Sequence, residues 1–176
     1  MTSPYALYQF WLNVADADVY RYLKFYSFLS VNEIEEIEQS DKNSQGRREA
    51  QGILAAEVTE LLHGATGLTA AKRISDALFS GDIAQLTNED LDQLELDGLP
   101  CTVFAGGNKG IVEVLVDTDL AKSNKMAREF IGNNAINVNG QLVDSVNFEL
   151  DVSNALNGKY FLLKRGKKLF HLAKFV

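Results

Sequence analysis

The most restrictive feature of the sequence is a change of pattern near residue 100, where glycine and proline gather. Gly98-Leu99-Pro100 and Gly106-Gly107-Asn108-Lys109-Gly110 bracket a short segment, and such clusters interrupt helices and strands alike. Apolar residues recur at helical spacing before the segment, whereas short apolar runs and Asn-Gly dipeptides follow it. We therefore expect an α+β protein with an all-α domain at residues 1–98, a linker at 99–110 and a small α+β domain at 111–176.

Local start and stop signals divide the first hundred residues into helices with short connections. Pro4 suits a first helical position, where a missing N–H costs nothing, and Ser30-Val31-Asn32-Glu33 matches a capping box. Further helices are expected at 16–29, 48–63, 68–78 and after Thr87, with a polar loop at 42–48. Leu54, Val58, Leu61 and Leu62 are expected to face a core, and Gly64 to end their helix.

No residue of this half has a catalytic arrangement. Asp16 and Asp18 lie near an expected helix start, where the helix dipole favours carboxylates, so their first interpretation is structural. The single Cys101 excludes an internal disulfide, and with only His63 and His171 no metal site is expected. No apolar run reaches the roughly 20 residues that span a bilayer, and the pattern of a secretory signal is missing. A cytoplasmic protein without membrane contact is expected.

Charge is distributed unevenly along the chain. The net charge of −7 argues against nucleic-acid binding when it is taken as one number. Residues 1–100 carry 17 acidic and 7 basic side chains, whereas residues 101–176 carry 7 acidic and 10 basic ones, a local net charge of +3. No acidic residue follows Asp151. Such an asymmetry indicates a nucleic acid or another anionic surface as the partner of the second half.

Residues 122–143 predict a short basic helix, a turn and a hairpin. Ser123 can cap the helix by accepting backbone N–H groups of the first turn. The apolar face would hold Met126, Ala127, Phe130 and Ile131, and another face would hold Lys122, Lys125 and Arg128. Gly132-Asn133-Asn134 ends the helix, because Gly and Asn tolerate the left-handed conformation. Asn139-Gly140 predicts a type I′ hairpin turn.

This stretch resembles the alpha-L RNA-binding fold, which is named from small-subunit ribosomal protein four. In those families the basic helix and the following turn lie against structured RNA. The resemblance implies RNA contacts for Lys122, Lys125, Arg128 and Asn134. A basic helix on a solvated face beside an ordinary hairpin is the alternative, because short motifs also match by chance.

A second basic segment lies near the C-terminus. Residues 160–163 and 169–175 predict two strands joined by a loop, in which Gly166 permits a sharp turn. The loop carries four cations, Lys164, Arg165, Lys167 and Lys168. Because these charges repel one another, a polyanion that neutralises them is the simplest explanation. A solvated loop without a ligand is the alternative.

One resemblance covers nearly the whole chain. Its first segments are similar to the start of the anticodon-binding helical domain of bacterial tyrosyl-tRNA synthetases. They are Thr2-Ser3-Pro4-Tyr5, Tyr8-Gln9-Phe10-Trp11, Asn13, Ala15-Asp16-Ala17-Asp18-Val19 and Arg21-Tyr22-Leu23-Lys24. The similarity continues through Ala55-Ala56-Glu57-Val58-Thr59, the stretch up to Gly64, Ala77-Leu78-Phe79-Ser80-Gly81 and the basic tail. On these residues the chain is identified as a member of that family.

The family resemblance implies the architecture and the partner. It implies a helical anticodon-binding domain, a flexible joint at the linker, a helix rather than a strand at 111–116, and an alpha-L RNA-binding domain. Lys125, Arg128 and the cluster at 164–168 would contact the variable arm and anticodon stem of tyrosine tRNA, mainly through shape and backbone. Asp16 or Asp18 would help to recognise the anticodon, since a carboxylate accepts hydrogen bonds from base edges.

The family's catalytic domain is expected to be missing from this chain. That domain is a Rossmann-type fold with a HIGH-like motif and a KMSKS-like loop, and neither motif occurs in the sequence. The chain is therefore expected to begin just after the catalytic part of a class I tyrosine-tRNA ligase, an enzyme of translation that forms homodimers. The fragment is expected to be inactive and monomeric, and to need no cofactor, because ATP and tyrosine bind the catalytic domain.

Two other functions fit parts of the sequence. A stand-alone, ribosome-associated RNA binder could use the same alpha-L fold, although it would lack this particular helical half. Alternatively, residues 1–100 could form a protein-interaction bundle, and exposure of Tyr8, Phe10 and Trp11 would support that function.

Overall fold

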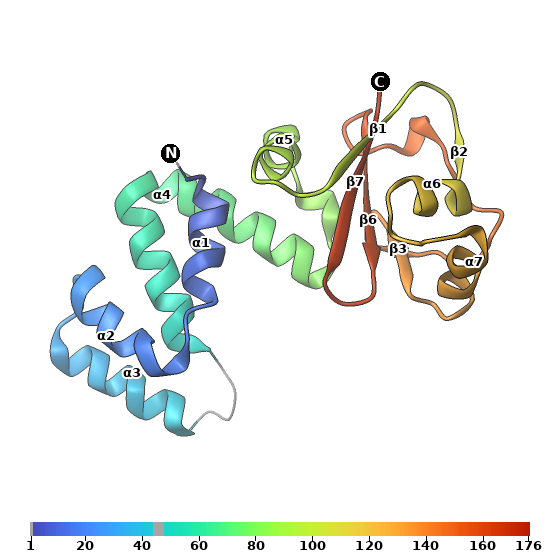
Figure 1. Ribbon diagram of the computed structural model, residues 1–176. Helices are drawn as coiled ribbons and strands as arrows, with labels where there is room; N and C mark the ends of the chain where they lie inside the picture. The colour runs from blue at the N-terminus through green and yellow to red at the C-terminus, as the bar shows by residue number, and fades with distance from the viewer. Residues whose placement is uncertain (1, 44–47) are drawn as a thin grey trace. The chain divides into compact units, whose positions relative to one another are not determined.

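The computed structural model describes residues 2–43 and 48–176, and the chain divides into two compact units, Met1–Ser75 and Asp76–Val176 (Figure 1). The sequence placed the division at residue 98, whereas the first compact unit ends at Ser75. The predicted polar loop at 42–48 lies mostly outside the described residues, and Lys42 and Asn43 belong to a helix.

The first unit is helical, as predicted. It contains α1 (Pro4–Leu12), α2 (Asp16–Tyr26), α3 (Val31–Asn43) and the first part of α4 (Glu49–Ser80). Ser3 Oγ accepts a hydrogen bond from Ala6 N at 3.0 Å, and Pro4 occupies the first position of α1. Before α3, Ser30 N donates to Glu33 Oε2 at 2.7 Å and Glu33 N donates to Ser30 Oγ at 3.3 Å. Both predicted helix starts are confirmed.

The helix α4 is interrupted at Gly64, whose φ of 69° and ψ of 176° are not helical. This confirms the predicted helix end, because glycine enters the positive-φ region at little cost. Leu54 and Val58 are buried in a cluster with residues of α2 and α3. Leu61 and Leu62 are 56% and 62% exposed, so the prediction that they face a core is wrong. Neither of the two apolar clusters of described residues that contain Leu54, Val58 and Ala55 includes a residue of the last turn before Gly64.

The second unit is built on a mixed five-stranded sheet with the order β1-β7-β6-β3-β4. Its strands are β1 (Cys101–Phe104), β3 (Ile136–Val138), β4 (Gln141–Leu142), β6 (Tyr160–Arg165) and β7 (Leu169–Phe175). β1 is parallel to β7, and the other neighbours are antiparallel. A separate ladder joins β2 (Lys109–Gly110) to β5 (Glu149–Leu150), and short 3₁₀ turns η1 (Ile83–Gln85) and η2 (Val152–Asn154) complete the unit. The mixed α+β class is thus confirmed.

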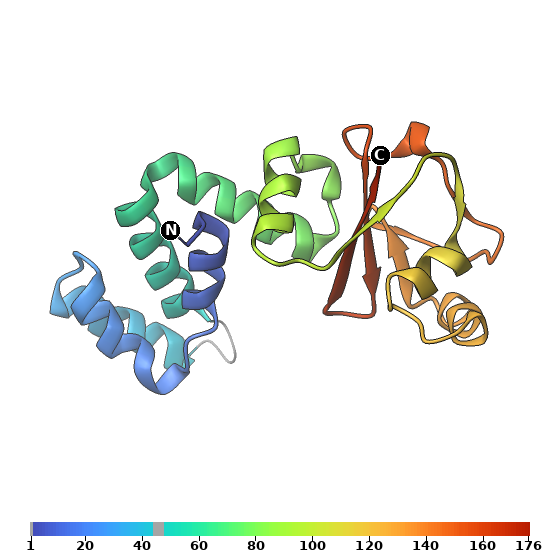
Figure 2. The same cartoon turned by 45° about the horizontal axis from the view of Figure 1, so that its top comes forward.

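Helices cover both faces of this sheet (Figure 2). α5 (Asn88–Leu96) lies on one face, and α6 (Ile111–Asp117) and α7 (Asn124–Gly132) lie on the other. The helix expected at 111–116 from the family resemblance is confirmed, although local propensity favoured a strand there.

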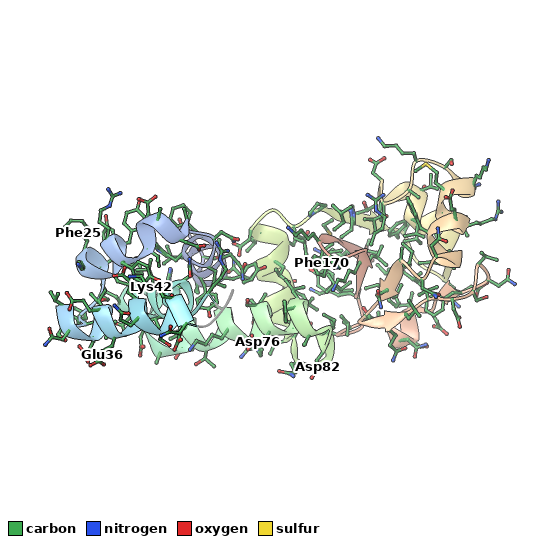
Figure 3. All side chains as sticks on the ribbon, turned by 90° about the horizontal axis from the view of Figure 1, so that it is seen from below. Phe25, Glu36, Lys42, Asp76, Asp82 and Phe170 are labelled. Carbon is green, nitrogen blue, oxygen red and sulfur yellow. The ribbon has the colours of Figure 1, made fainter. Side chains whose placement is uncertain are left out.

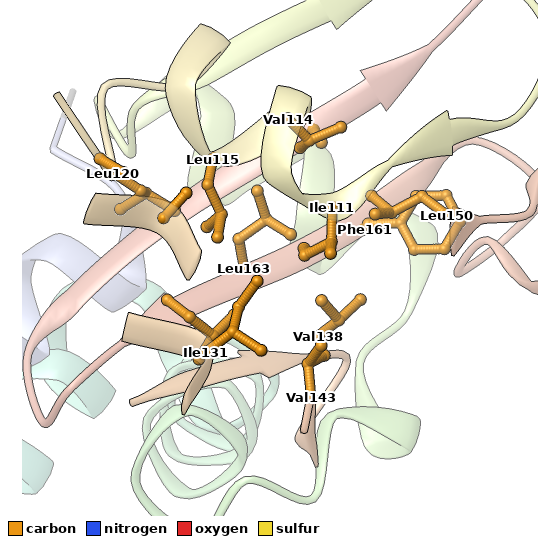
Figure 4. Packing of buried hydrophobic residues seen from close by; sticks show 14 of the residues in the cluster. Ile111, Val114, Leu115, Leu120, Ile131, Val138, Val143, Leu150, Phe161 and Leu163 are labelled. Atoms are coloured by element: carbon orange, nitrogen blue, oxygen red, sulfur yellow. The ribbon is translucent and has the colours of Figure 1, made fainter. Parts of the chain in front are cut away.

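The larger core of the second unit fills the space between the sheet and the pair α6–α7 (Figure 4). Phe161 and Leu163 of β6 pack with Ile111, Leu115 and Ile131, and all five side chains are buried. Burying each such side chain stabilises the fold by about 1.5–3 kcal/mol. Because successive strand residues point to opposite faces, this core also fixes which cations of β6 point toward α7.

Residues in the left-handed conformation set the turns of this unit. Asn134 follows α7 with a φ of 54°, and Asn139 and Gly140 form the β3–β4 turn with φ values of 49° and 80°. These conformations confirm the turns predicted from the Asn and Gly positions. Asn139 Oδ1 also accepts a hydrogen bond from Leu162 N at 2.9 Å. A Cβ on Gly140 would lie 2.0 Å from the carbonyl oxygen of Gly81, so the backbones meet where no side chain fits.

The segment predicted as a linker contains regular structure. β1 pairs along β7, and Leu172 N donates to Pro100 O at 2.7 Å. α5 is attached to the sheet by Tyr160, whose hydroxyl lies 2.6 Å from Asp92 Oδ1 and 2.9 Å from Glu95 Oε2. α5 therefore belongs to the second unit, although the sequence placed it in the helical domain.

Candidate nucleic-acid interface

The N-terminus of α7 and the side of this helix that faces the core agree with the sequence prediction. Ser123 Oγ accepts a hydrogen bond from Met126 N at 3.3 Å and caps the helix. The apolar side of α7 packs into the core of the second unit. Lys122, Lys125 and Arg128 are exposed. The first predicted group of cations is therefore available to a ligand.

The second group lies at the end of β6 and in the loop to β7, and its four cations do not share one face: Lys164 and Arg165 belong to the strand, and Lys167 and Lys168 to the loop. Gly166 turns the chain with a φ of 62°, and Lys167 and Lys168 are exposed at the tip. Arg165 follows Leu163 by two positions and points to the α7 side of the sheet. Lys164 points to the other side, where its Nζ lies 5.1 Å from the ring centroid of Phe170, a residue of β7 labelled in Figure 3.

Arg165 connects the loop to the segment that carries α7. Its Nη1 donates a hydrogen bond to the carbonyl oxygen of Leu120, and its guanidinium carbon lies 5.0 Å from the ring centroid of Phe130. Gly166 N also donates to Ala135 O at 2.8 Å. These contacts hold the two basic segments in a fixed relation, because each one joins the loop to residues 120–135.

An open depression of about 440 Å³ lies between these two segments. Its lining, here called the basic depression, consists of Phe130, Ala135, Arg165, Gly166, Lys167, Lys168 and Leu169. Sequence patterning assigned Phe130 to the buried face of the helix, whereas its side chain is half-buried and lines the depression. No local signal marks this role, because it depends on where Arg165 lies in space.

The exposed cations lack carboxylate partners in the part of the chain that the structure describes. No ion pair there involves Lys122, Lys125, Arg128, Lys167 or Lys168. An unpaired cluster of like charges raises the electrostatic potential of its surface and attracts anions.

Two other lysines of the C-terminal region are paired. Lys159 Nζ lies 3.1 Å from Asp92 Oδ1, and Lys174 Nζ lies 2.8 Å from Glu95 Oε2. The pKa of Asp92 is lowered, first by the hydrogen bond from Tyr160 and then by that from Lys159. The pKa of Glu95 is lowered, first by Lys174 and then by Tyr160. These lysines serve the attachment of α5 and are not part of the exposed group.

Asp16 and Asp18 lie in the first turn of α2, where the helix dipole favours them as expected. Asp16 Oδ1 accepts a hydrogen bond from Gln51 Nε2 at 2.7 Å, and Arg48 Nη2 lies 3.6 Å from the same oxygen. Asp18 pairs with Arg21 at 3.3 Å. The Asp16 side chain is 84% exposed, so its carboxylate is accessible despite these contacts.

Aromatic side chains gather near these carboxylates within the first unit. An open pocket of about 480 Å³ is lined by Phe10, Trp11, Asn13, Val14, Ala15, Asp18, Tyr22 and Tyr26. The Trp11 ring contacts Tyr22 and Tyr26 at centroid distances of 5.6 and 5.4 Å. Phe25, labelled on α2 in Figure 3, is 71% exposed. The aromatic side chains of the first unit are therefore partly buried and partly exposed.

Two kinds of site are missing from the described residues. No group of three or more His, Cys, Asp or Glu side chains among them could hold a metal ion. None of the helices in the described ranges combines the length and apolar character needed to cross a membrane.

Comparison with protein families first gives the class. Residues 1–80 match the model described as "tRNA synthetases class I (W and Y)", which places the helical unit in a class I aminoacyl-tRNA synthetase. Residues 90–173 match the model described as "Tyrosine--tRNA ligase SYY-like C-terminal domain". The chain belongs to the tyrosyl-tRNA synthetase family and corresponds to its C-terminal region, the anticodon-binding part together with the C-terminal domain.

Individual relatives agree with this assignment. The chain is 60% identical to a tyrosine--tRNA ligase of Aliivibrio fischeri (strain MJ11) over 171 residues, 97% of this chain and 40% of that protein. It is 51% identical to the Laribacter hongkongensis enzyme over 170 residues, again 97% and 40%. A solution structure of a tyrosyl-tRNA synthetase C-terminal domain is 39% identical, with a TM-score of 0.46, and covers 57% of this chain and 100% of that one. The chain thus spans about two fifths of the length of these curated relatives.

Proposed function

We propose that this chain is the tRNA-binding part of a tyrosine-tRNA ligase and holds tyrosine tRNA while another part of the enzyme aminoacylates it. The observation that carries the proposal is a group of five exposed cations: Lys122 just before α7, Lys125 and Arg128 on α7, and Lys167 and Lys168 in the β6–β7 loop. Arg165 joins the two segments, and none of the five has an ion-pair partner among the described residues. Family membership makes tRNA the polyanion that such a surface would meet.

The proposed mechanism is positioning. Contacts to the long variable arm and the anticodon stem would keep the acceptor end of the tRNA at a distant active site, which saves the entropy of a separate encounter. A-form RNA offers its backbone and shape more readily than its base edges, and that suits lysine and arginine. Asp16 or Asp18, together with Asn134 at the end of α7, would add contacts, since a carboxylate or amide accepts hydrogen bonds from bases or sugars.

The chemistry belongs in this proposal to the catalytic domain of the full-length enzyme, which uses ATP. The 176 residues would bind tRNA in the cytoplasm and would neither bind ATP or tyrosine nor aminoacylate. They would be monomeric, whereas the full-length enzyme would be a homodimer. An aminoacylation assay with the chain alone should give no product.

A titration with three RNAs tests the proposal. The chain is titrated with tyrosine tRNA, with the same tRNA lacking its variable arm, and with an unrelated short-arm tRNA, each at several salt concentrations. We expect the intact tyrosine tRNA to bind most tightly. If each of the five cations neutralises one phosphate, log K should fall with log salt with a slope of roughly −4. Equal affinity for all three RNAs would defeat the specific function.

Reversing the charge of two of these lysines tests whether they belong to the tRNA-binding surface. The double variant Lys167→Glu and Lys168→Glu should weaken tRNA binding at least tenfold, because two phosphate contacts become repulsive. Lys24→Glu with Lys72→Glu is the matched control, since both lysines are exposed on helices of the first unit. Equal losses in the two double variants would mean that the effect reflects net charge and not the proposed surface.

The exposed aromatic side chains favour a second, compatible function for the first unit. Of the three residues whose exposure would support this function, only Phe10 is exposed, at 64%, whereas Tyr8 is buried and Trp11 is half-buried. Phe25 and Phe28 are 71% and 86% exposed as well, and exposed apolar patches mark interaction surfaces. In this second function the unit would bind the catalytic part of the enzyme. Phe25→Ser with Phe28→Ser should then weaken association with a separately produced catalytic domain, measured by calorimetry, and should leave tRNA affinity unchanged.

A further inference from the structure

The floor of the basic depression is apolar, although its rim is charged. Phe130 and Ala135 are half-buried, and Leu169 is 47% exposed even though it begins a strand. Phosphate groups gain nothing from such a surface, because their recognition needs cations and hydrogen-bond donors. The floor therefore fits a ligand that has an apolar face as well as negative charge.

The aromatic ring on this floor is held in place together with a guanidinium group. The Arg165 guanidinium lies over Phe130 with 5.0 Å from its carbon to the ring centroid. The same side chain donates to the carbonyl oxygen of Leu120, which restrains its position. Aromatic rings and guanidinium planes are the surfaces on which unpaired bases stack in RNA-binding proteins. A stacking platform thus exists before any ligand arrives.

The rim favours an anion. Lys167 and Lys168 are exposed at the loop tip, and neither has an ion-pair partner in the described ranges. The described residues that line the depression include no acidic side chain. The volume of about 440 Å³ lies within the range of about 300–1,000 Å³ that holds small ligands and is large enough for one nucleotide.

We infer that the basic depression binds a single unstacked nucleotide of the RNA, with its base against Phe130, Arg165 and Leu169 and its flanking phosphates beside Lys167 and Lys168. The inference rests on the proposed RNA-binding function and narrows its ligand to RNA with a bulged or looped-out nucleotide. A base inside a duplex has both faces covered by its neighbours, so it cannot use this floor. Paired RNA would use the cations alone.

Three short RNA hairpins separate these two modes of binding. They share one stem sequence, and they carry a single bulged adenosine, an abasic residue at the same bulge, or no bulge. Affinities for the 176-residue chain are measured by fluorescence anisotropy at low salt. We expect the bulged adenosine to bind about tenfold more tightly than either other hairpin, since stacking of one base on an aromatic group has an effect of this size.

Two substitutions locate the effect. Phe130→Leu should reduce the tenfold preference to threefold or less and should change affinity for the fully paired hairpin by less than twofold. Leu169→Ser should also reduce the preference for the bulged hairpin. Because Leu169 is exposed, this variant should fold normally and provides a test even if Phe130→Leu does not fold. Phe148→Leu is the matched control, because it makes the same change at a 36% exposed phenylalanine of the same unit that does not line the depression.

The results distinguish this inference from the proposed function. Strong, salt-dependent binding with equal affinity for all three hairpins would overturn the nucleotide site and leave RNA binding in place. No binding to any hairpin or to tyrosine tRNA would overturn both. A preference for the bulged hairpin that survives Phe130→Leu and Leu169→Ser unchanged would place the base elsewhere and would also overturn the inference. Displacement of all hairpins by an equimolar oligo-glutamate peptide would show that charge alone is recognised.

Discussion

At the scale of single residues, glycine and asparagine determine how the second unit turns. Gly140 and Gly158 both have positive φ values, 80° and 75°, but their surroundings differ. A Cβ on Gly140 would meet the Gly81 carbonyl oxygen at 2.0 Å, whereas a Cβ on Gly158 would have no heavy atom within 4 Å. The two positions therefore separate backbone strain from steric overlap.

We predict that Gly140→Ala destabilises the fold more than Gly158→Ala. The strain of a positive φ at a non-glycine residue costs about 1 kcal/mol, and it applies to both variants. Gly140→Ala must also push the β3–β4 turn away from Gly81, which adds about 2 kcal/mol. Urea unfolding followed by circular dichroism measures both variants, and equal losses of stability would contradict the predicted contact.

These turns also show what the sequence predicts at this scale. Asn139-Gly140 specifies its own conformation through local preferences, and the prediction of a type I′ turn was therefore possible. The approach of Gly140 to Gly81 joins residues 59 positions apart and depends on tertiary packing. No short sequence motif could therefore predict this approach. The same holds for Phe130, whose contact with Arg165 arises across the fold.

At the scale of elements, the attachment of α5 is ionic and therefore sensitive to pH. Asp92 accepts hydrogen bonds from Tyr160 and Lys159, and Glu95 accepts them from Lys174 and Tyr160. These donors lower the pKa of both carboxyl groups in the folded state. Burial, followed by hydrogen bonds to the two carboxylates, raises the pKa of Tyr160, so its hydroxyl stays protonated and remains a donor.

We predict that the second unit loses stability in mild acid. Because the folded-state pKa values of Asp92 and Glu95 are lowered, the unfolded chain takes up protons first as the pH falls. The contribution of these groups is complete above about pH 4.5, the ordinary range of carboxyl groups, and is lost progressively below it. Melting temperatures measured between pH 7 and pH 3 should fall less steeply for Asp92→Asn with Glu95→Gln than for the unchanged chain. Parallel curves would contradict the prediction.

Prediction of elements from the sequence succeeded where the signal lies within a few residues. It failed where the outcome depends on tertiary contacts with distant residues. The predicted helix start at Pro4 and the predicted caps at Ser30 and Ser123 were correct, because each depends on residues within three positions. The burial of Leu61 and Leu62 was wrong, because helical spacing names a face but not what covers it. The strand predicted at 160–163 extends to Arg165, so Lys164 and Arg165 alternate between the two faces of the sheet instead of lying in the loop.

At the scale of the whole molecule, the candidate cations and the candidate carboxylates lie in different units. The candidate cations of α7 and the β6–β7 loop lie in residues 76–176, and the carboxylates Asp16 and Asp18 lie in residues 1–75. The family and the mixed α+β class were predictable from the sequence, because long matching segments cover both halves. The division near residue 75 was not, because α5 resembles any short capped helix until its contacts with Tyr160 are known.

We predict that salt-dependent RNA binding resides in the second unit. A polypeptide of residues 76–176 should bind tyrosine tRNA with a salt slope of roughly −4, equal to that of the whole chain, since it keeps all five exposed cations. Its affinity should be lower, because contacts from the first unit are lost. Anisotropy titrations between about 50 and 200 mM salt measure the slope. A slope near zero, with circular dichroism showing a folded polypeptide, would assign the phosphate contacts to the first unit.

The pairing of Lys159 and Lys174 with acids of α5 has a consequence for selectivity. A count of basic residues suggests that cations cover the whole second unit. Two of its ammonium groups, however, are neutralised by these carboxylates on the sheet face away from α7. The two acids on α5 therefore reduce the number of unpaired cations that could bind nucleic acids nonspecifically. Replacing Asp92 and Glu95 with neutral residues should therefore raise the affinity of the chain for unrelated nucleic acids, even though none of the five exposed cations has changed.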